Sequence, residues 1–194
     1  KKEVCKVQSP SPTHFTEEDI SASQKKLTLM DAISDLPELK ADDLSKKYKS
    51  APKNNYQLNL KNGVKKLTEH NSSNYGPKML EILSLIPEGG SVNNLPMRLR
   101  PKSYFGNTYA RLLSNKPSPT ITRNFGTPSS SRCVHPFQNR ALSTREGARL
   151  QGFPDDYIFF GNKTSKNLQI GNAVPPILGE IIGNEILRSI KKSI

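Results

Sequence analysis

The sequence has no tryptophan, only two cysteines and no long hydrophobic run. Two cysteines, Cys5 and Cys133, give neither a disulfide framework nor a four-ligand zinc site, so a reducing, cytoplasmic setting is expected. The longest apolar runs, at 157–160 and 174–178, are far shorter than the ~20 residues that a bilayer span requires. The first residues also lack the apolar stretch of a signal peptide. We therefore expect no membrane partner.

Apolar residues are also scarce. They make up 34% of the 194 residues, mean hydropathy is −0.62, and 15 residues are proline. This supply is thin for one compact domain of this length. Long loops, or a missing partner that covers apolar surface, are the expectation, and a fragment without a stable fold is a weaker alternative.

Acidic residues are absent between Glu88 and Glu146, although the whole chain carries a net charge of +12. Such a concentration of positive charge favours a polyanionic partner, with nucleic acid first, because cations bind phosphates with release of counterions. An ordinary solvated basic face is an equally good interpretation of composition alone. The nine cations of this acid-free segment are Arg98, Arg100, Lys102, Arg111, Lys116, Arg123, Arg132, Arg140 and Arg145.

Local patterns predict three short helices in the first 152 residues. One lies around 31–36 and is ended by Pro37, and a second begins at Pro77 and runs to about Ile86. The third follows Ser143, which has capping-box spacing to Glu146. Residues 40–75 show weak periodicity and are expected to be mostly loop.

Two further patterns concern strands and the last helix. The segments 108–113 and 119–125 have the β-branched and aromatic content of strands, which predicts a small sheet. Residues 4–7 resemble the remnant of another strand. Near the end of the chain, Asn172 is expected to cap a helix whose first turn accommodates Pro175 and Pro176.

Residues 140–178 contain two recognisable blocks. The first runs from Arg145-Glu146 through 148–155 (ARLQGFPD), and the second is 171–176 (GNAVPP). In this order and spacing they resemble motifs IX and X, the last two characteristic blocks of the DNA (cytosine-5) methyltransferase family. Looser upstream segments resemble those that surround the target-recognition domain of that family, and they lie at 31–37, 109–112, 119–122 and 134–136.

Other hallmarks of the family do not occur in this sequence. The Phe-x-Gly-x-Gly cofactor loop, the Pro-Cys nucleophile, the Glu-Asn-Val acid and the Gln-x-Arg-x-Arg segment are all absent. Cys5 follows Val4 and Cys133 follows Arg132, so both cysteines are expected to be structural. The chain thus resembles the C-terminal part of such an enzyme, either as the natural small subunit of a split methyltransferase or as a fragment.

The resemblance implies an α+β fold. A small mixed target-recognition domain with short strands and helices would occupy 16–140, after a connector at 1–15. A motif IX segment would follow at 141–165. The motif X segment, 166–194, would end in a helix that completes the α/β, Rossmann-like domain of a partner segment.

The function implied is DNA binding and sequence specification for an enzyme that transfers methyl from S-adenosylmethionine to cytosine C5, in restriction-modification. The resemblance also implies that the chain is inactive alone and requires double-stranded DNA and a catalytic subunit or segment as partners. The alternative is a stand-alone DNA-binding module, derived from a methyltransferase, without a catalytic partner.

The resemblance places Thr120 where the family has a Thr-Leu-type dipeptide near the flipped nucleotide, although a plain strand threonine is the alternative. Arg123 and Asn124 are the candidate base readers, because their side chains match guanine and adenine edges. Arg98, Arg100 and Arg111 are expected to contact phosphates or face solvent. These six form the predicted DNA-binding set.

Other predicted roles are few. Asn172 and Ala173 match the place where the family's last block contacts the cofactor, and Arg145 and Glu146 match an architectural block. No catalytic residue is expected in this chain. His135 has no cysteine or histidine at ligand spacing, so no metal site is expected.

Overall fold

The computed structural model describes residues 7, 9–10, 26–40, 44–130 and 132–192. The chain divides into two compact units, one formed by Leu27–Ala173 and the other by Lys1–Lys26 with Val174–Ile194. The expected connector at 1–15 and the strand remnant at 4–7 lie almost entirely outside the described residues.

A helix forms at each of the first two predicted positions, although the first ends at Ile33, three residues before its expected end at Leu36. Helix α1 (Leu29–Ile33) begins two residues earlier than expected because Thr28 and Asp31 form a capping box, with Asp31 N donating to Thr28 Oγ1 at 3.2 Å. Helix α3 (Pro77–Ser84) starts with its proline at the first position and buries Ile82 and Leu83. Two 3₁₀ turns, η1 (Val92–Asn94) and η2 (Met97–Leu99), follow α3.

Helix α4 (Thr144–Leu150) is the third predicted helix, and Ser143 caps it as expected. Helix α2 (Asn55–Lys61) was not predicted, because it lies in the segment interpreted as loop. Its signals are the end residues: the side chain of Asn54 accepts from Gln57 N at 2.9 Å, and Asn62 ends the helix with a left-handed φ of 44°.

The expectation for Asn172 is wrong. Asn172 is the last residue of an additional helix, α5 (Lys163–Asn172), and does not cap α6 (Pro176–Lys192). Helix α5 begins at Asn162, whose side chain accepts from Ser165 N at 2.9 Å. Ala173 is extended and ends α5. Because a residue before proline is disfavoured in helical geometry, Val174 and Pro175 do not continue the helix, and the next helix begins at Pro176.

The expected small sheet does not form in the described residues, which contain only isolated bridges at Arg111–Val134, Val134–Ala141 and Leu44–Asn71. Two local conformations explain this. Tyr109 has a positive φ of 57°, which interrupts the extended segment 108–113. Residues 122–125 close into a turn, in which Phe125 N donates to Thr122 O at 3.0 Å.

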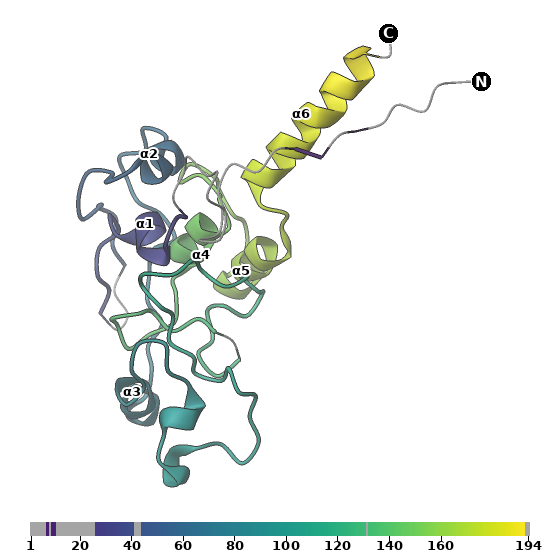
Figure 1. Ribbon diagram of the computed structural model, residues 1–194. Coiled ribbons are helices and arrows are strands. Elements are labelled where there is room, and N and C mark those ends of the chain that lie inside the picture. Colours follow the sequence, from purple (N-terminus) through teal and green to yellow (C-terminus); the bar gives the residue numbers. More distant parts are fainter. Residues whose placement is uncertain (1–6, 8, 11–25, 41–43, 131, 193–194) are drawn as a thin grey trace. The chain divides into compact units, whose positions relative to one another are not determined.

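The unit 27–173 contains two cores. In Figure 1, α1 and α4 lie together with α5 beside them, whereas α3 lies at the other end of the unit next to the 3₁₀ turns. The first core packs residues such as Leu29 and Ala148, so segments on both sides of position 140 share one interior. The second core is built on Leu83 and Val92.

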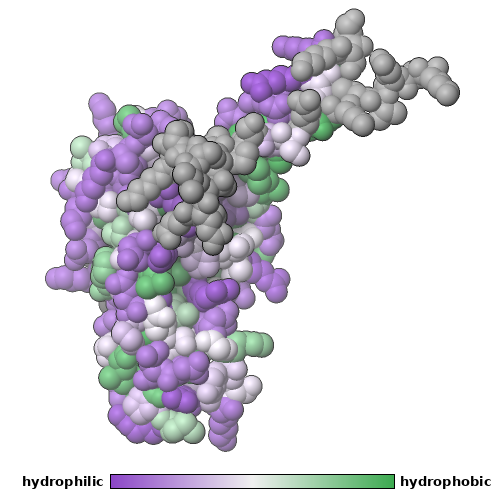
Figure 2. Space-filling model, viewed as in Figure 1, coloured by the Kyte–Doolittle hydropathy of each residue, from purple (hydrophilic) through white to green (hydrophobic). Residues whose placement is uncertain are grey.

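Helix α6 carries apolar side chains that are 41–56% exposed: Ile177, Leu178, Ile182, Ile186, Leu187 and Ile190. In the described part of the chain no helix is both long enough and apolar enough to cross a bilayer. Figure 2 shows that hydrophilic residues dominate the visible surface of the unit 27–173, with scattered apolar patches.

Candidate nucleic-acid interface

Helix α4 lies in the interior and carries charge there. All residues from Thr144 to Arg149 are buried. Its capping box is closed in both directions: Glu146 N donates to Ser143 Oγ at 3.1 Å, and Ser143 N donates to Glu146 Oε2 at 2.7 Å. The helix start is therefore fixed by the same carboxylate that must be neutralised inside the protein.

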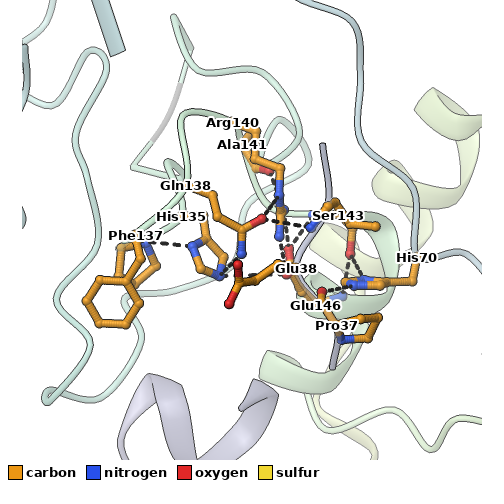
Figure 3. A network of polar contacts seen from close by, with 12 residues as sticks. Pro37, Glu38, His70, His135, Phe137, Gln138, Arg140, Ala141, Ser143 and Glu146 are labelled. Atoms are coloured by element: carbon orange, nitrogen blue, oxygen red, sulfur yellow. Dashed lines mark hydrogen bonds and ion pairs between the residues drawn. The ribbon is translucent and has the colours of Figure 1, made fainter. Parts of the chain in front are cut away.

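Arg140 neutralises that carboxylate. Its Nη1 and Nη2 each donate to one oxygen of Glu146 at 2.7 Å, a bidentate pair that can be followed in Figure 3. Burial would raise the pKa of Glu146, but the Arg140 guanidinium outweighs it and holds that pKa well below its usual range. Glu146 is thus a fixed anion and has no proton to donate near neutral pH.

Two buried histidines flank this pair (Figure 3). His70 Nε2 lies 2.8 Å from Pro37 O, which can only accept, so Nδ1 accepts from Ser143 Oγ at 2.9 Å. Nδ1 of His135 accepts from Phe137 N at 3.1 Å. Burial lowers the pKa of both rings, that of His135 to about 4.

No cluster of three or more histidine, cysteine or acidic side chains suited to a metal ion occurs among the described residues. His70 contacts the start of α4 through Ser143, and His135 Nε2 lies 3.9 Å from Glu146 Oε1. They are neutral at pH 7.

A second buried network of charged side chains lies at the other end of α4, and the sequence analysis did not predict it. Arg149 is bound by two carboxylates, with Nη2 donating to Asp35 Oδ2 at 3.1 Å and to Asp155 Oδ2 at 2.6 Å. All three side chains are fully or almost fully buried. Burial would lower the pKa of Arg149, but its hydrogen bonds to the two aspartates raise it.

Arg145 occupies the same interior. Its Nε and Nη2 donate to the carbonyl and hydroxyl oxygens of Thr68, at 3.1 and 2.8 Å, and its Nη1 lies 3.7 Å from Asp155 Oδ1. The sequence offered one signal for these contacts, namely three charges placed within a seven-residue helix that also carries small apolar residues. Nothing in the sequence indicated which distant residues would pair with them.

Arg111 lies inside the protein, and this geometry does not suit the phosphate contact expected for it. It is 7% exposed, and it donates to carbonyl oxygens at the end of α3, to Leu83 at 2.5 Å and to Ile86 at 2.8 Å. It also donates to His135 O at 2.8 Å. Carbonyls at a helix C-terminus lack partners and attract cations, so Arg111 joins α3 to the 135–139 loop.

The other predicted phosphate contacts lie nearer the surface. The side chain of Arg98 is 71% exposed and lies 3.3 Å from Glu81. Arg100 is half-buried and donates to Leu95 O and Asn93 O, both at 2.8 Å.

The candidate base readers lie on a turn that follows Thr120. Thr120, Arg123 and Asn124 are exposed, whereas Ile121 and Phe125 are 4% and 1% exposed. No hydrogen bond or ion pair joins the three exposed side chains to another described residue. Two buried anchors therefore present three polar side chains to solvent.

Glycines allow the helices to touch this turn directly. A Cβ atom on Gly171 of α5 would lie 2.2 Å from Arg123 N and 2.5 Å from Thr122 C, so helix and turn meet backbone to backbone. A Cβ on Gly147 of α4 would lie 2.2 Å from the Phe125 ring. No side chain larger than hydrogen fits at either position without moving the turn.

The turn is also held at its far end. A Cβ on Gly126 would lie 2.4 Å from Asn167 Nδ2, and Asn167 Oδ1 accepts from Thr144 Oγ1 at 2.8 Å. Helices α4 and α5 thus fix both ends of the turn that carries Arg123 and Asn124.

The residues expected to contact the cofactor follow Gly171. Asn172 is exposed, and Ala173 is half-buried with its carbonyl oxygen accepting from Gln151 Nε2 at 2.6 Å. One cavity lies beside Tyr48 and another beside Tyr104, and neither is lined by Asn172 or Ala173. These residues do not enclose a site for S-adenosylmethionine by themselves, so no step of methyl transfer follows from them.

Cys133 is not a nucleophile. It is fully buried, its Sγ lies 3.4 Å from Thr127 O, and burial raises its pKa to about 12. At neutral pH it is a protonated thiol without access to a substrate.

The sequence pattern of the C-5 cytosine-specific DNA methylases matches residues 4–188. The chain belongs to this family. It is 34% identical over 179 residues to the type II methyltransferase M.DdeI of Desulfomicrobium norvegicum, a match that covers 82% of this chain and 42% of M.DdeI. It is 40% identical over 122 residues to M1.HphI of Haemophilus parahaemolyticus, covering 63% and 32%. The chain thus spans less than half of these two DNA methylases.

For the type II methyltransferase M.AquIB of Picosynechococcus, by contrast, the match covers most of the relative's length. The match is 34% identical over 131 residues and covers 62% of this chain but 87% of M.AquIB. The chain also resembles the crystal structure of a candidate DNA modification methyltransferase from an Escherichia coli prophage, with a TM-score of 0.63 and 22% identity over 91% of this chain and 51% of that one. This likeness shows a DNA methyltransferase fold, although the regular structure in the described residues of this chain consists of helices and isolated bridges.

Proposed function

We propose that this chain is the DNA-binding, target-specifying portion of a cytosine-C5 methyltransferase in a restriction-modification system. It acts with a catalytic segment that carries the nucleophile and most of the S-adenosylmethionine site. The observation that carries the proposal is the turn at 122–125, where exposed Arg123 and Asn124 are fixed by α4 and α5 in a member of the DNA methylase family.

Base reading fits the state of these two side chains. Arginine matches the two acceptors of guanine and asparagine the acceptor and donor of adenine, so each can form a bidentate pair. Within the described structure neither Arg123 nor Asn124 is engaged elsewhere, and both are accessible. Because the backbone below them is fixed, little ordering is needed when DNA binds.

Phosphate binding falls to the cations of the acid-free segment that remain at the surface. Arg111, Arg140 and Arg145 are buried, which removes them from this role. The exposed cations of the segment are Arg98, Lys102, Lys116, Arg123 and Arg132. Their contacts with the DNA backbone would make binding fall steeply with salt.

A catalytic partner segment is supported by three observations. The sequence has no Pro-Cys pair, and Cys133 is a buried, protonated thiol. Helix α6 exposes apolar side chains such as Ile186 and Leu187, which a partner segment would cover. M.AquIB, matched over 87% of its length, is a methyltransferase by name with little sequence beyond the region shared with this chain.

In the assembled enzyme the target cytosine would leave the duplex, because its C5 is out of reach inside the base stack. The thiolate of the catalytic segment would add to C6, and bound S-adenosylmethionine would supply the methyl group. This chain would hold the DNA around the extruded base, with Thr120 beside the backbone and Arg145 and Glu146 in architectural roles. Asn172, next to Gly171, would bring the edge of the cofactor site close to the turn at 122–125, which we call the reading turn.

The proposal is tested by expressing this chain with and without the protein encoded immediately upstream of it. Bisulfite sequencing of plasmid DNA then reports methylated cytosines and their sequence context. Methylation only with both proteins is the expected result. Methylation by this chain alone would contradict the need for a partner, and no methylation with a soluble partner would favour a stand-alone DNA-binding module.

A further inference from the structure

A pair of exposed aromatic residues precedes the turn at 122–125 in the sequence and is not part of it. Phe105 is 82% exposed and its neighbour Tyr104 is 40% exposed. Large rings in water are costly, and at a protein surface they commonly mark a binding site. Neither side chain is used by the function proposed above.

The backbone holds Phe105 at the tip of a closed turn. Thr108 N donates to Phe105 O at 2.9 Å, while Phe105 N donates to Thr108 Oγ1 at 3.2 Å. Thr108 is buried, and its carbonyl oxygen accepts from Val92 N at 2.9 Å. The exposed ring is therefore presented by an ordered turn, which lowers the entropy lost when the ring contacts a ligand.

A cavity of about 320 Å³ opens beside these rings. Tyr104, Phe105 and the buried Tyr109 line it together with Ser129. This volume is at the lower end of the range of small-molecule pockets, which suits one flat ring system rather than a larger ligand.

The charge of the chain segment that lines the cavity indicates a nucleic acid. All the lining residues belong to the acid-free segment, in which Lys102 lies between two of them in sequence and Arg98 and Arg132 are also exposed. Cations that bind phosphates, together with aromatic faces that stack on bases, characterise surfaces that bind unpaired nucleotides.

The cavity also lies close to the reading turn. Tyr109 N donates to Pro128 O at 3.0 Å, and Thr127 N donates to Asn124 O at 2.9 Å. Ser129 follows Asn124 by five residues, so the two can be at most about 17 Å apart. A DNA strand bound at Asn124 therefore has bases within reach of the cavity.

We propose that Tyr104, Phe105 and the cavity beside them form a stacking site for one unpaired base of the bound DNA, distinct from the target cytosine. This inference rests on the proposed DNA-binding function. The base stacks on the ring of Phe105, and exposed cations of the acid-free segment bind the backbone phosphates on either side of it. Because stacking involves any base face, the site contributes affinity for distorted DNA rather than sequence preference.

The absence of tryptophan from the sequence allows a direct test. The Phe105→Trp variant places a single indole at the proposed site, and its fluorescence is followed while a 30-base-pair duplex with one bulged nucleotide is added to the 194-residue chain. Phe160→Trp is the matched control, because Phe160 is 76% exposed and lies outside the site. Fluorescence anisotropy of the labelled duplex measures binding of each variant in parallel.

We expect DNA to quench the indole of the Phe105→Trp variant but not that of the Phe160→Trp control. Unmodified protein should bind the bulged duplex more tightly than the fully paired one, and Phe105→Ala should abolish that difference with a loss of about tenfold on the bulged duplex. An unquenched indole in bound complexes of Phe105→Trp, or an unchanged preference in Phe105→Ala, would overturn the stacking site and leave DNA binding intact. Failure of the unmodified chain to bind either duplex would also overturn the stacking site, whereas the proposed function is decided by the methylation test with the upstream protein.

Discussion

Arginines perform opposite tasks in two neighbouring regions of this protein. Around α4, Arg140, Arg145 and Arg149 are buried and bound to carboxylates or carbonyls. On the turn that rests against α4 and α5, Arg123 is exposed and unengaged within the described structure. The difference lies in the neighbouring acceptors, because a buried guanidinium needs its hydrogen bonds satisfied and an exposed one is satisfied by water.

The two regions depend on each other. The buried network fixes α4, where Gly147 packs against the ring of Phe125, while Gly171 of α5 meets the backbone of the turn directly. Cations inside thus provide the rigidity with which Arg123 and Asn124 are presented. The net charge of the segment overstates the positive charge that it exposes, since three of its nine cations are interior.

The largest effect on stability is expected from Arg149→Met. The change removes the cation that binds both Asp35 and Asp155 and leaves Asp155 only the more distant Arg145, which should lower the free energy of unfolding by about 3–5 kcal/mol. Urea unfolding followed by circular dichroism measures it, with Arg123→Met as the exposed control. Equal, small losses in both variants would show that the buried network does not support the fold.

The second largest effect is expected from acid, which should lower the free energy of unfolding through the buried histidines. The pKa of His135 falls from 6.5 to about 4 on folding, so as pH drops the unfolded chain takes up the proton first. Stability should be full above pH 6.5 and decline by about 3 kcal/mol down to pH 4. The pKa of Glu146 is also lowered, which adds a further loss below about pH 4.5.

The His135→Gln variant tests the assignment of this slope. Its unfolding free energy should fall less between pH 6.5 and 4, with a remaining slope from His70, whose pKa is lowered as well. Unfolding curves collected across this range at constant ionic strength provide the comparison. A wild-type profile that is flat down to pH 4.5 would contradict neutral, buried histidines.

How much the sequence predicts differs between the same two regions. The starts of α3 and α4 were predicted from local signals at Pro77 and Ser143, whose effects act within one helical turn. The start of α1 was predicted two residues late, although the capping box of Thr28 and Asp31 is an equally local signal. Pairing of Arg149 with Asp35 joins residues 114 positions apart, and no local pattern contains it. For the same reason Arg111 looked like a surface cation, since its carbonyl partners come from the tertiary fold.

Strand prediction failed where backbone geometry overrode side-chain preference. The β-branched and aromatic composition of 108–113 and 119–125 fits strands, but Tyr109 adopts a left-handed conformation and 122–125 forms a turn. Thr120, Arg123 and Asn124, which the sequence analysis named as DNA contacts, are exposed. Their role in DNA recognition is a prediction that rests on the family resemblance and on this exposure.

Gly171→Ala tests the contact that joins the two regions. The new methyl group would overlap the backbone at Arg123, so we expect a loss of about 1–3 kcal/mol and a displaced turn. Gly179→Ala in α6 is the matched control, because nothing lies within 4 Å of its Cβ and the helix should gain about 0.5–1 kcal/mol. Thermal unfolding separates the two, and a stabilised Gly171→Ala protein would refute the direct contact.

The smallest effect on stability, and the most informative about function, is expected from Arg123→Ala. Its unfolding free energy should change by less than about 0.5 kcal/mol, because the side chain is exposed. Loss of a bidentate base contact should nevertheless cost about 1–3 kcal/mol of discrimination at one position of the target. Methylation of a randomised duplex library by the enzyme assembled with its catalytic segment would show relaxed preference at that position.

Arg132→Ala, which removes another exposed cation, should instead weaken binding evenly across sequences and reduce its salt dependence by about one phosphate. If the two variants behaved alike, Arg123 would be a phosphate contact, and the reading of bases would have to come from Asn124 or from another loop.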